Sequence, residues 1–93
     1  MTELEKAREE INEIDRQIAA LFEKRMHAAA AIGAFKAEHH LPILDPAREE
    51  ALIRRNSALI EDEQLVPYYQ EYLRRTMELS RRYQAELNEG RKA

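Results

Sequence analysis

Two positively charged side chains, Arg25 and Lys36, flank a run of ten mostly small or apolar residues. At about 100° per helical residue, this spacing brings the helix back to within ~20° of its starting direction, about 16 Å further along its axis. Both cations therefore share one face of a predicted helix. Arg25 occupies an otherwise apolar position of that face, so it points inward and needs a carboxylate partner or an anionic ligand. For Arg25 alone, a structural ion pair or a polar residue that sets helix register fits as well.

Further polar side chains point toward the same interior from two later helices. Arg48 and Glu49 each lie one turn before an apolar residue of their helix, and Ser80 and Gln84 lie four apart within an apolar stripe. Ordinary explanations exist as well, because Glu49 suits a helix N-terminus, and Ser80 and Gln84 could be satisfied core polar residues. Together with Arg25, they predict one polar cluster to which all three helices contribute.

The longest helix is predicted over residues 3–38. Thr2 and Glu5 have the spacing of a capping box, and the first helix breaker is Pro42. Apolar residues recur at alternating steps of three and four, which predicts a long helix packed along one seam. The seam consists of Leu4, Ala7, Ile11, Ile14, Ile18, Leu21, Arg25, Ala28, Ile32 and Phe35.

Two shorter helices complete a single all-α domain of three helices over residues 1–93. Asp45 as N-cap and Pro46 at the first helical position predict a second helix that ends near Ile60. The acidic segment EDEQ is the next connection, and Pro67 begins the third helix. The final NEGRKA segment is expected to be frayed.

Composition narrows the possible functions. The chain has no Cys, which excludes a disulfide framework, a thiol nucleophile and a cysteine metal site. Its net charge of −3 disfavours nucleic acid as a partner. No apolar run is long enough to span a membrane and no signal peptide is recognisable, so a cytoplasmic protein is expected. The histidines lack ligand-like spacing, so no metal is expected, and a solvated face is predicted for Arg74, Arg75, Arg81 and Arg82.

The length of the first helix predicts a second chain. A helix over residues 3–38 is about 54 Å long, whereas a compact chain of this size is about 32 Å across. Two short helices cannot cover such a seam, so a homodimer with adjacent copies of the long helix is expected. Arg8 lies about 25 Å from Arg25 along the same helix and about 100° around it. It can reach such a cluster only in the partner chain of an antiparallel dimer.

The segments AREEINEID, GAFK and PILDPAREE, together with Arg25, Ser80 and Gln84, carry a resemblance to the small all-α chorismate mutases. The resemblance covers essentially the whole chain. It implies an intertwined homodimer of three-helix chains with two shared active sites. It also implies conversion of chorismate to prephenate, in phenylalanine and tyrosine biosynthesis, without a cofactor.

The resemblance also implies roles for single residues. Arg25 and Arg8 of the partner chain would clamp the carboxylates of the chorismate dianion, with assistance from Ser80. Lys36 and Gln84 would donate hydrogen bonds to the ether oxygen, where negative charge develops as the C–O bond breaks. Holding the flexible substrate in its reactive shape would supply the rest of the catalysis.

Other residues of the resemblance complete the pocket. Glu49 and the backbone around Asp45 would hold the ring hydroxyl, Arg48 would assist with a carboxylate, and Ile32 and Met77 would form apolar walls. The implied catalytic residues are Arg25, Lys36, Glu49 and Gln84. The implied substrate-binding residues are Arg8, Arg25, Lys36, Asp45, Arg48, Glu49, Ser80 and Gln84.

Two other functions fit the same helices. Related helical dimers act as isochorismate-pyruvate lyases with a similar cationic pocket, although the connection EHHLPILDPAREE is closer to the mutase type. The other alternative is a non-enzymatic helical dimer that serves as an adaptor or regulatory partner.

Overall fold

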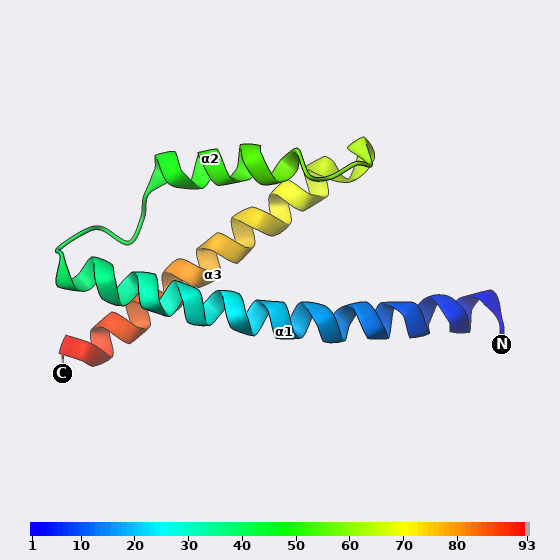
Figure 1. Ribbon diagram of the computed structural model, residues 1–93, viewed down its shortest axis with the longest axis horizontal. Coiled ribbons are helices and arrows are strands. Elements are labelled where there is room, and N and C mark those ends of the chain that lie inside the picture. Colours follow the sequence, from blue (N-terminus) through cyan, green and yellow to red (C-terminus); the bar gives the residue numbers. More distant parts are fainter. Residues whose placement is uncertain (93) are drawn as a thin grey trace.

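The chain folds into three α-helices and one short 3-10 helix. The computed structural model describes the backbone of residues 1–92 and the side chains of residues 1–90. The helices are α1 (Glu3–Glu38), α2 (Pro46–Ser57), η1 (Glu63–Leu65) and α3 (Val66–Lys92), and no strand occurs within the described residues (Figure 1). The predicted all-α class with three helices and a long N-terminal helix is therefore confirmed.

Helix α1 begins and ends where local chemistry requires. The Thr2 hydroxyl accepts a hydrogen bond from the Glu5 backbone N–H at 3.1 Å, which confirms the predicted N-cap. At the other end, His40 adopts a left-handed conformation with φ of 55°. The backbone N–H of Leu41 then donates to the Lys36 carbonyl at 2.8 Å, and that of His40 donates to the Ala37 carbonyl at 3.4 Å. This Schellman-type ending turns the chain sharply toward α2.

Helix α2 begins as predicted but ends earlier. The Asp45 carboxylate accepts a hydrogen bond from the Arg48 backbone N–H at 3.1 Å, and Pro46 is the first helical residue. The helix ends at Ser57, so the expected end near Ile60 is wrong. Residues 58–60 instead form a turn.

The connection to α3 is more structured than predicted. Asp62 caps the 3-10 helix η1 by accepting from the Gln64 backbone N–H at 3.1 Å, and α3 follows directly at Val66. The expectation of a frayed NEGRKA end is wrong through Lys92, which is still helical. Ala93 lies outside the described residues.

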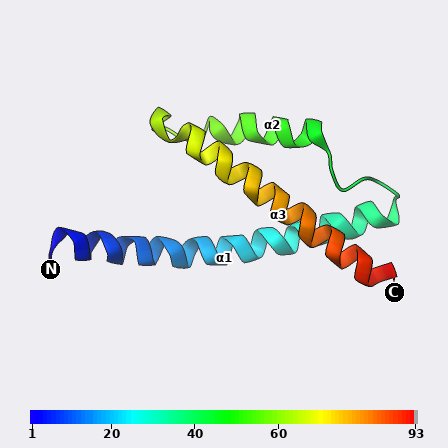
Figure 2. The ribbon, with the colours of Figure 1, turned by 180° about the vertical axis from the view of Figure 1, so that it is seen from behind.

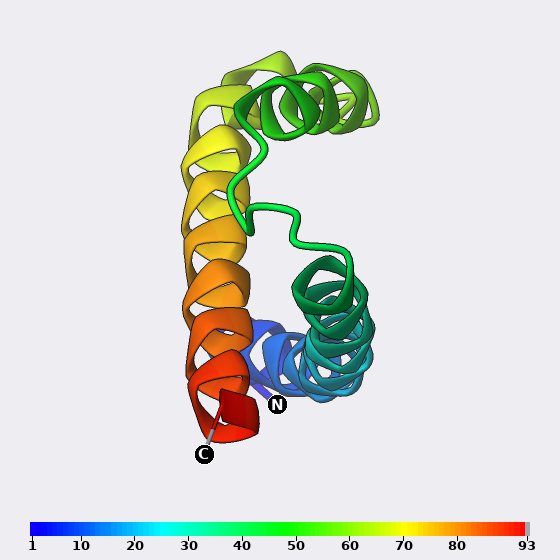
Figure 3. The same cartoon turned by 90° about the vertical axis from the view of Figure 1, so that its left-hand side faces the viewer.

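Helix α3 joins the other two helices, which do not contact each other. Seen along α1, helices α1 and α2 lie on the same side of α3 and near its two ends (Figure 3). A small core between α2 and α3 consists of Ile53, Leu73 and Met77. Where α3 crosses the C-terminal part of α1, the buried α1 residues are Ala29 and Gly33 (Figure 2). Because these two residues are small, the backbones of α1 and α3 can approach each other closely at the crossing.

The N-terminal two thirds of α1 is exposed along its whole length. Every residue from Met1 to Lys24 is exposed, including Ile11 at 55% and Leu21 at 63%. The molecule measures 54 × 28 × 14 Å, with a radius of gyration of 16.7 Å. A compact chain of this length would have a radius of gyration of about 12 Å. The apolar seam predicted to face inward therefore faces solvent in the single chain, and this includes its last third, where Ile32 and Phe35 are 50% and 55% exposed. Within residues 1–92, no helix is both long and apolar enough to cross a membrane.

Candidate active site

A cleft of about 330 Å³ opens between α1 and α2, and α3 forms its floor. This volume lies at the lower end of the range typical of small-molecule sites. The residues that line it are Arg25, Ala28, Ala29, Ile32, Lys36, Ile43, Asp45, Arg48, Glu49, Leu52, Met77, Ser80, Arg81 and Gln84. We refer to it as the three-helix cleft. It contains seven of the eight predicted substrate-binding residues, and the eighth, Arg8, lies on the exposed N-terminal part of α1.

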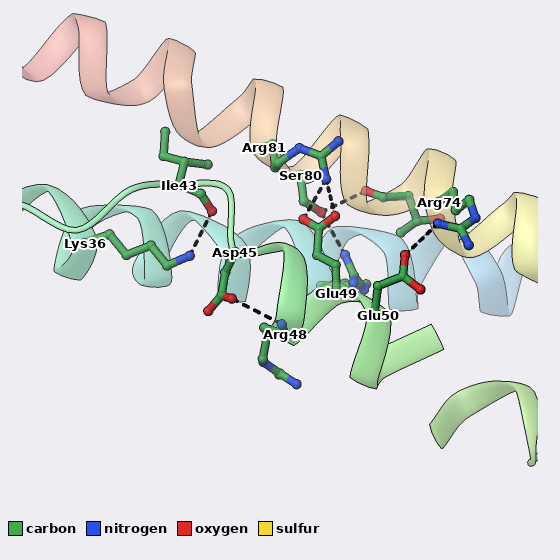
Figure 4. A network of polar contacts seen from close by, with 11 residues as sticks. Lys36, Ile43, Asp45, Arg48, Glu49, Glu50, Arg74, Ser80 and Arg81 are labelled. Atoms are coloured by element: carbon green, nitrogen blue, oxygen red, sulfur yellow. Dashed lines mark hydrogen bonds and ion pairs between the residues drawn. The ribbon is translucent and has the colours of Figure 1, made fainter. Parts of the chain in front are cut away.

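Arg25 and Ser80 join α1 to α3 at the floor of the cleft. The Arg25 guanidinium donates to the Ser80 hydroxyl at 2.7 Å, and this hydroxyl donates in turn to the Thr76 carbonyl at 3.0 Å. Ser80 is labelled in Figure 4. Ser80 is 6% exposed and Arg25 is half-buried. Within the described residues, no carboxylate lies within ion-pair distance of Arg25. The alternative of a structural ion pair at Arg25 is therefore not observed.

Lys36 and the loop before α2 form one side of the cleft. The Lys36 ammonium donates to the Ile43 carbonyl at 2.9 Å, which ties the loop to the last turn of α1 (Figure 4). Asp45 is exposed and its carboxylate is used to cap α2. Arg48 lines the mouth of the cleft with an exposed side chain. An ammonium has three donors, so Lys36 keeps two for a ligand.

The side-chain amide of Gln84 lies in the cleft and packs closely against Gly33 of α1. Gln84 is 7% exposed, and among the described residues its buried amide oxygen Oε1 has no hydrogen-bond partner. Gly33 of α1 lies so close that a Cβ atom there would come within 2.8 Å of Gln84 Cγ and 3.0 Å of Gln84 Cβ. The absence of a side chain at Gly33 therefore leaves the space that the Gln84 side chain occupies. The sequence analysis missed this role, since only the contact between helices reveals it.

Glu49 is held by a residue that the sequence analysis placed on the surface. Both Glu49 carboxylate oxygens accept from Arg81 Nη1, at 2.5 and 2.6 Å (Figure 4). The prediction of a solvated face is confirmed for Arg74, Arg75 and Arg82 but is wrong for Arg81, which is half-buried. The available signal was its spacing, because Arg81 lies four residues after Met77 and three before Gln84 and so shares their face of α3.

The remaining walls are apolar, and the overall charge of the cleft is positive. Met77 is 5% exposed and lies on the floor, and Ile32 lines the α1 side. Four cationic and two acidic side chains line the cleft, a net charge of two positive. No histidine lines it. Within the described residues, no group of three or more His, Asp and Glu side chains could hold a metal ion. The cleft thus offers positive charge and hydrogen-bond donors to an anionic ligand.

Known proteins are similar to this chain in sequence. The sequence model of the family described as chorismate mutase type II matches residues 7–85. The bifunctional chorismate mutase/prephenate dehydratase of Aquifex aeolicus is 33% identical over 90 residues, which cover 88% of this chain and 25% of that protein. The T-protein of Haemophilus influenzae is 39% identical over 54 residues, which cover 58% of this chain and 14% of that protein. The chain thus spans a quarter or less of the length of these two relatives.

A solved structure shows the same arrangement of helices. A conserved hypothetical protein from Pyrococcus furiosus superposes with a TM-score of 0.74 at 37% sequence identity. The match covers 90% of this chain and 97% of that one, so the two chains share the fold over nearly their whole lengths.

Proposed function

The chain belongs to the chorismate mutase type II family, and from this membership and the three-helix cleft we propose that it converts chorismate to prephenate. Arg25 supports this function most directly. It is a half-buried cation at the floor of a positively charged cleft, and within the described residues it faces a serine and no carboxylate. A buried cation without an acid is costly unless an anionic ligand compensates it. Chorismate carries two carboxylates.

The reaction is an intramolecular rearrangement. The C–O bond of the enolpyruvyl ether breaks while a C–C bond forms between the side chain and the ring, and no proton is transferred. Catalysis then requires the compact conformation of the substrate and stabilisation of negative charge on the ether oxygen. Lys36 and Gln84 lie in the cleft with donors available for that oxygen.

The other residues hold the ends of the substrate. Arg25 and Ser80 bind one carboxylate, and Arg48 assists at the mouth of the cleft. The Glu49 carboxylate accepts from the ring hydroxyl, next to the backbone at Asp45. The apolar walls exclude water from the remaining faces of the substrate, which strengthens the polar contacts.

The active form is a homodimer in which Arg8 of the partner chain completes each site. The accessible surface of one chain is 7526 Å². A compact protein of this mass exposes about 5,600 Å². The excess is about what each partner buries in a large obligate interface. A second, mainly apolar groove between α1 and α3, lined by Ile18, Phe22 and Leu79 among others, offers a place for helices of the second chain.

A product analysis tests the proposed function. The purified chain is incubated separately with chorismate and with isochorismate, and the products are separated by chromatography. Prephenate from chorismate is the expected result. Salicylate and pyruvate from isochorismate, without prephenate formation, would instead identify a lyase on the same scaffold. No conversion of either compound by a folded dimer would refute the enzymatic function.

A further inference from the structure

Glu49 has a proposed role in substrate binding, but its ion-pair partner Arg81 has none. The ion pair joins α3 to α2 inside the cleft, and one guanidinium nitrogen contacts both carboxylate oxygens. A carboxylate has about four acceptor positions, so Glu49 keeps acceptor capacity for a hydroxyl of a ligand. The guanidinium therefore fixes the direction of the carboxylate without saturating it.

A second ion pair joins the same two helices outside the cleft and provides a reference. Arg74 and Glu50 lie 3.1 Å apart, with side chains 59% and 54% exposed. The side chains of Arg81 and Glu49 are only 31% and 23% exposed. Solvent screens the outer pair strongly and the inner pair much less. The charge of Arg81 therefore acts on the contents of the cleft, whereas that of Arg74 does not.

The charges of the cleft show why a cation at position 81 matters. The charged groups that line it are Arg25, Lys36, Arg48, Arg81, Asp45 and Glu49. Their net charge within one chain is two positive, to which Arg8 of the partner chain would add one in the proposed dimer. Without Arg81 the charge within one chain falls to one positive, and Glu49 becomes an uncompensated anion next to an anionic ligand. Like charges at such short range repel each other.

We propose that Arg81 is a positioning residue that orients Glu49 and cancels its charge, so that Glu49 can bind a hydroxyl of a dianionic substrate without repelling its carboxylates. This role rests on the proposed function, and it makes Arg81 a determinant of affinity. Arg81 acts through Glu49 and does not contact the substrate.

The test compares variants by chorismate kinetics and by calorimetric titration with prephenate. Arg81→Met is expected to raise KM for chorismate and Kd for prephenate about tenfold, with a much smaller change in kcat. Arg81→Lys keeps the charge and is expected to recover most of the affinity. Arg74→Met removes the outer pair and is expected to match the wild-type protein in both measurements.

The double variant Glu49→Gln/Arg81→Met separates the two possible roles of Arg81. It has the same net charge in the cleft as the wild-type protein, so it is expected to bind prephenate more tightly than Arg81→Met alone. Equal affinities for these two variants would mean that Arg81 contacts the dianion directly, which overturns the positioning role. An Arg81→Met variant indistinguishable from Arg74→Met would also overturn it.

Failure of the proposed function gives a different result. A wild-type chain that binds prephenate but does not convert chorismate refutes that function, and the affinities of the variants still decide the role of Arg81. Circular dichroism checks the fold of each variant. If Arg81→Met does not fold, Arg81→Lys and the double variant provide the comparison: weak binding by both would overturn the proposal.

Discussion

Gly33→Ala should reduce activity strongly because of a single methyl group. A Cβ atom at position 33 would lie 2.8 Å from Gln84 Cγ, 3.0 Å from Gln84 Cβ and 3.4 Å from Gln84 Oε1. Carbon atoms prefer separations of about 3.5–4.0 Å. Because the Cβ of Gln84 is fixed to its backbone, a change of rotamer cannot relieve the whole clash. Helices α1 and α3 must therefore separate locally, and the amide must move by about 1 Å.

The expected effects on activity and stability differ in size. A displacement of about 1 Å at a catalytic group can reduce the rate about a hundredfold. The added methyl gains about 1 kcal/mol from the helix propensity of Ala over Gly. Overpacking costs about 1–3 kcal/mol, so the net loss of stability is at most about 2 kcal/mol. We therefore expect kcat/KM to fall about a hundredfold while Tm falls by less than about 15 °C.

The assay measures kcat/KM for chorismate and the thermal unfolding of each variant. Gly90→Ala is the matched control, because it lies in α3 and a Cβ there would meet nothing within 4 Å. It should retain wild-type activity. In a Gln84→Ala background, adding Gly33→Ala should cost little further activity, since the amide is already absent. Wild-type kcat/KM in a folded Gly33→Ala variant, or an undiminished loss in the Gln84→Ala background, would refute the steric control of Gln84.

Three further substitutions test the site. Arg25→Leu should lose several orders of magnitude in activity while Tm stays equal or rises, because Ser80 keeps its bond to the Thr76 carbonyl. A clearly lower Tm than that of the wild-type protein would contradict this. Gln84→Glu should be slow at neutral pH and regain activity as the pH falls, because only a protonated carboxyl can donate to the ether oxygen. A pH profile of kcat/KM parallel to that of the wild-type protein would contradict this prediction. Mixing inactive Arg8→Ala protomers with inactive Lys36→Ala protomers should restore about a quarter of wild-type activity, because about half of the dimers are then heterodimers with one intact site of two. No recovery after verified subunit exchange would place Arg8 outside the shared site.

Local sequence signals predicted the helix starts well. The cap residues Thr2 and Asp45 form hydrogen bonds with backbone groups three residues ahead, so the spacing alone identified them. The end of α2 was predicted less well. Residues up to Ile60 have helical composition, and it is the turn at residues 58–60 that ends the helix.

The candidate site could be predicted in part because its residues repeat at helical spacing. Ser80 and Gln84 were expected inside, and both are buried. Arg81 and Gly33 were missed because their roles depend on a contact with another helix. The partner of Arg81 is thirty-two positions away in sequence, and Gly33 is distinguished only by the Gln84 side chain packed over it. Periodicity indicates which face of a helix points inward, but not what lies opposite.

The exposed N-terminal part of α1 links the stability of this helix to the concentration of the protein. A helix of some twenty residues without tertiary contacts is only marginally stable in water. In a separated chain, the backbone amide hydrogens of this segment would therefore exchange rapidly with solvent. In the proposed dimer they would be protected, so formation of the helix and association of the chains would become one coupled equilibrium. Turnover per chain would then decrease on dilution together with amide protection, long before α2 and α3 lose their own structure.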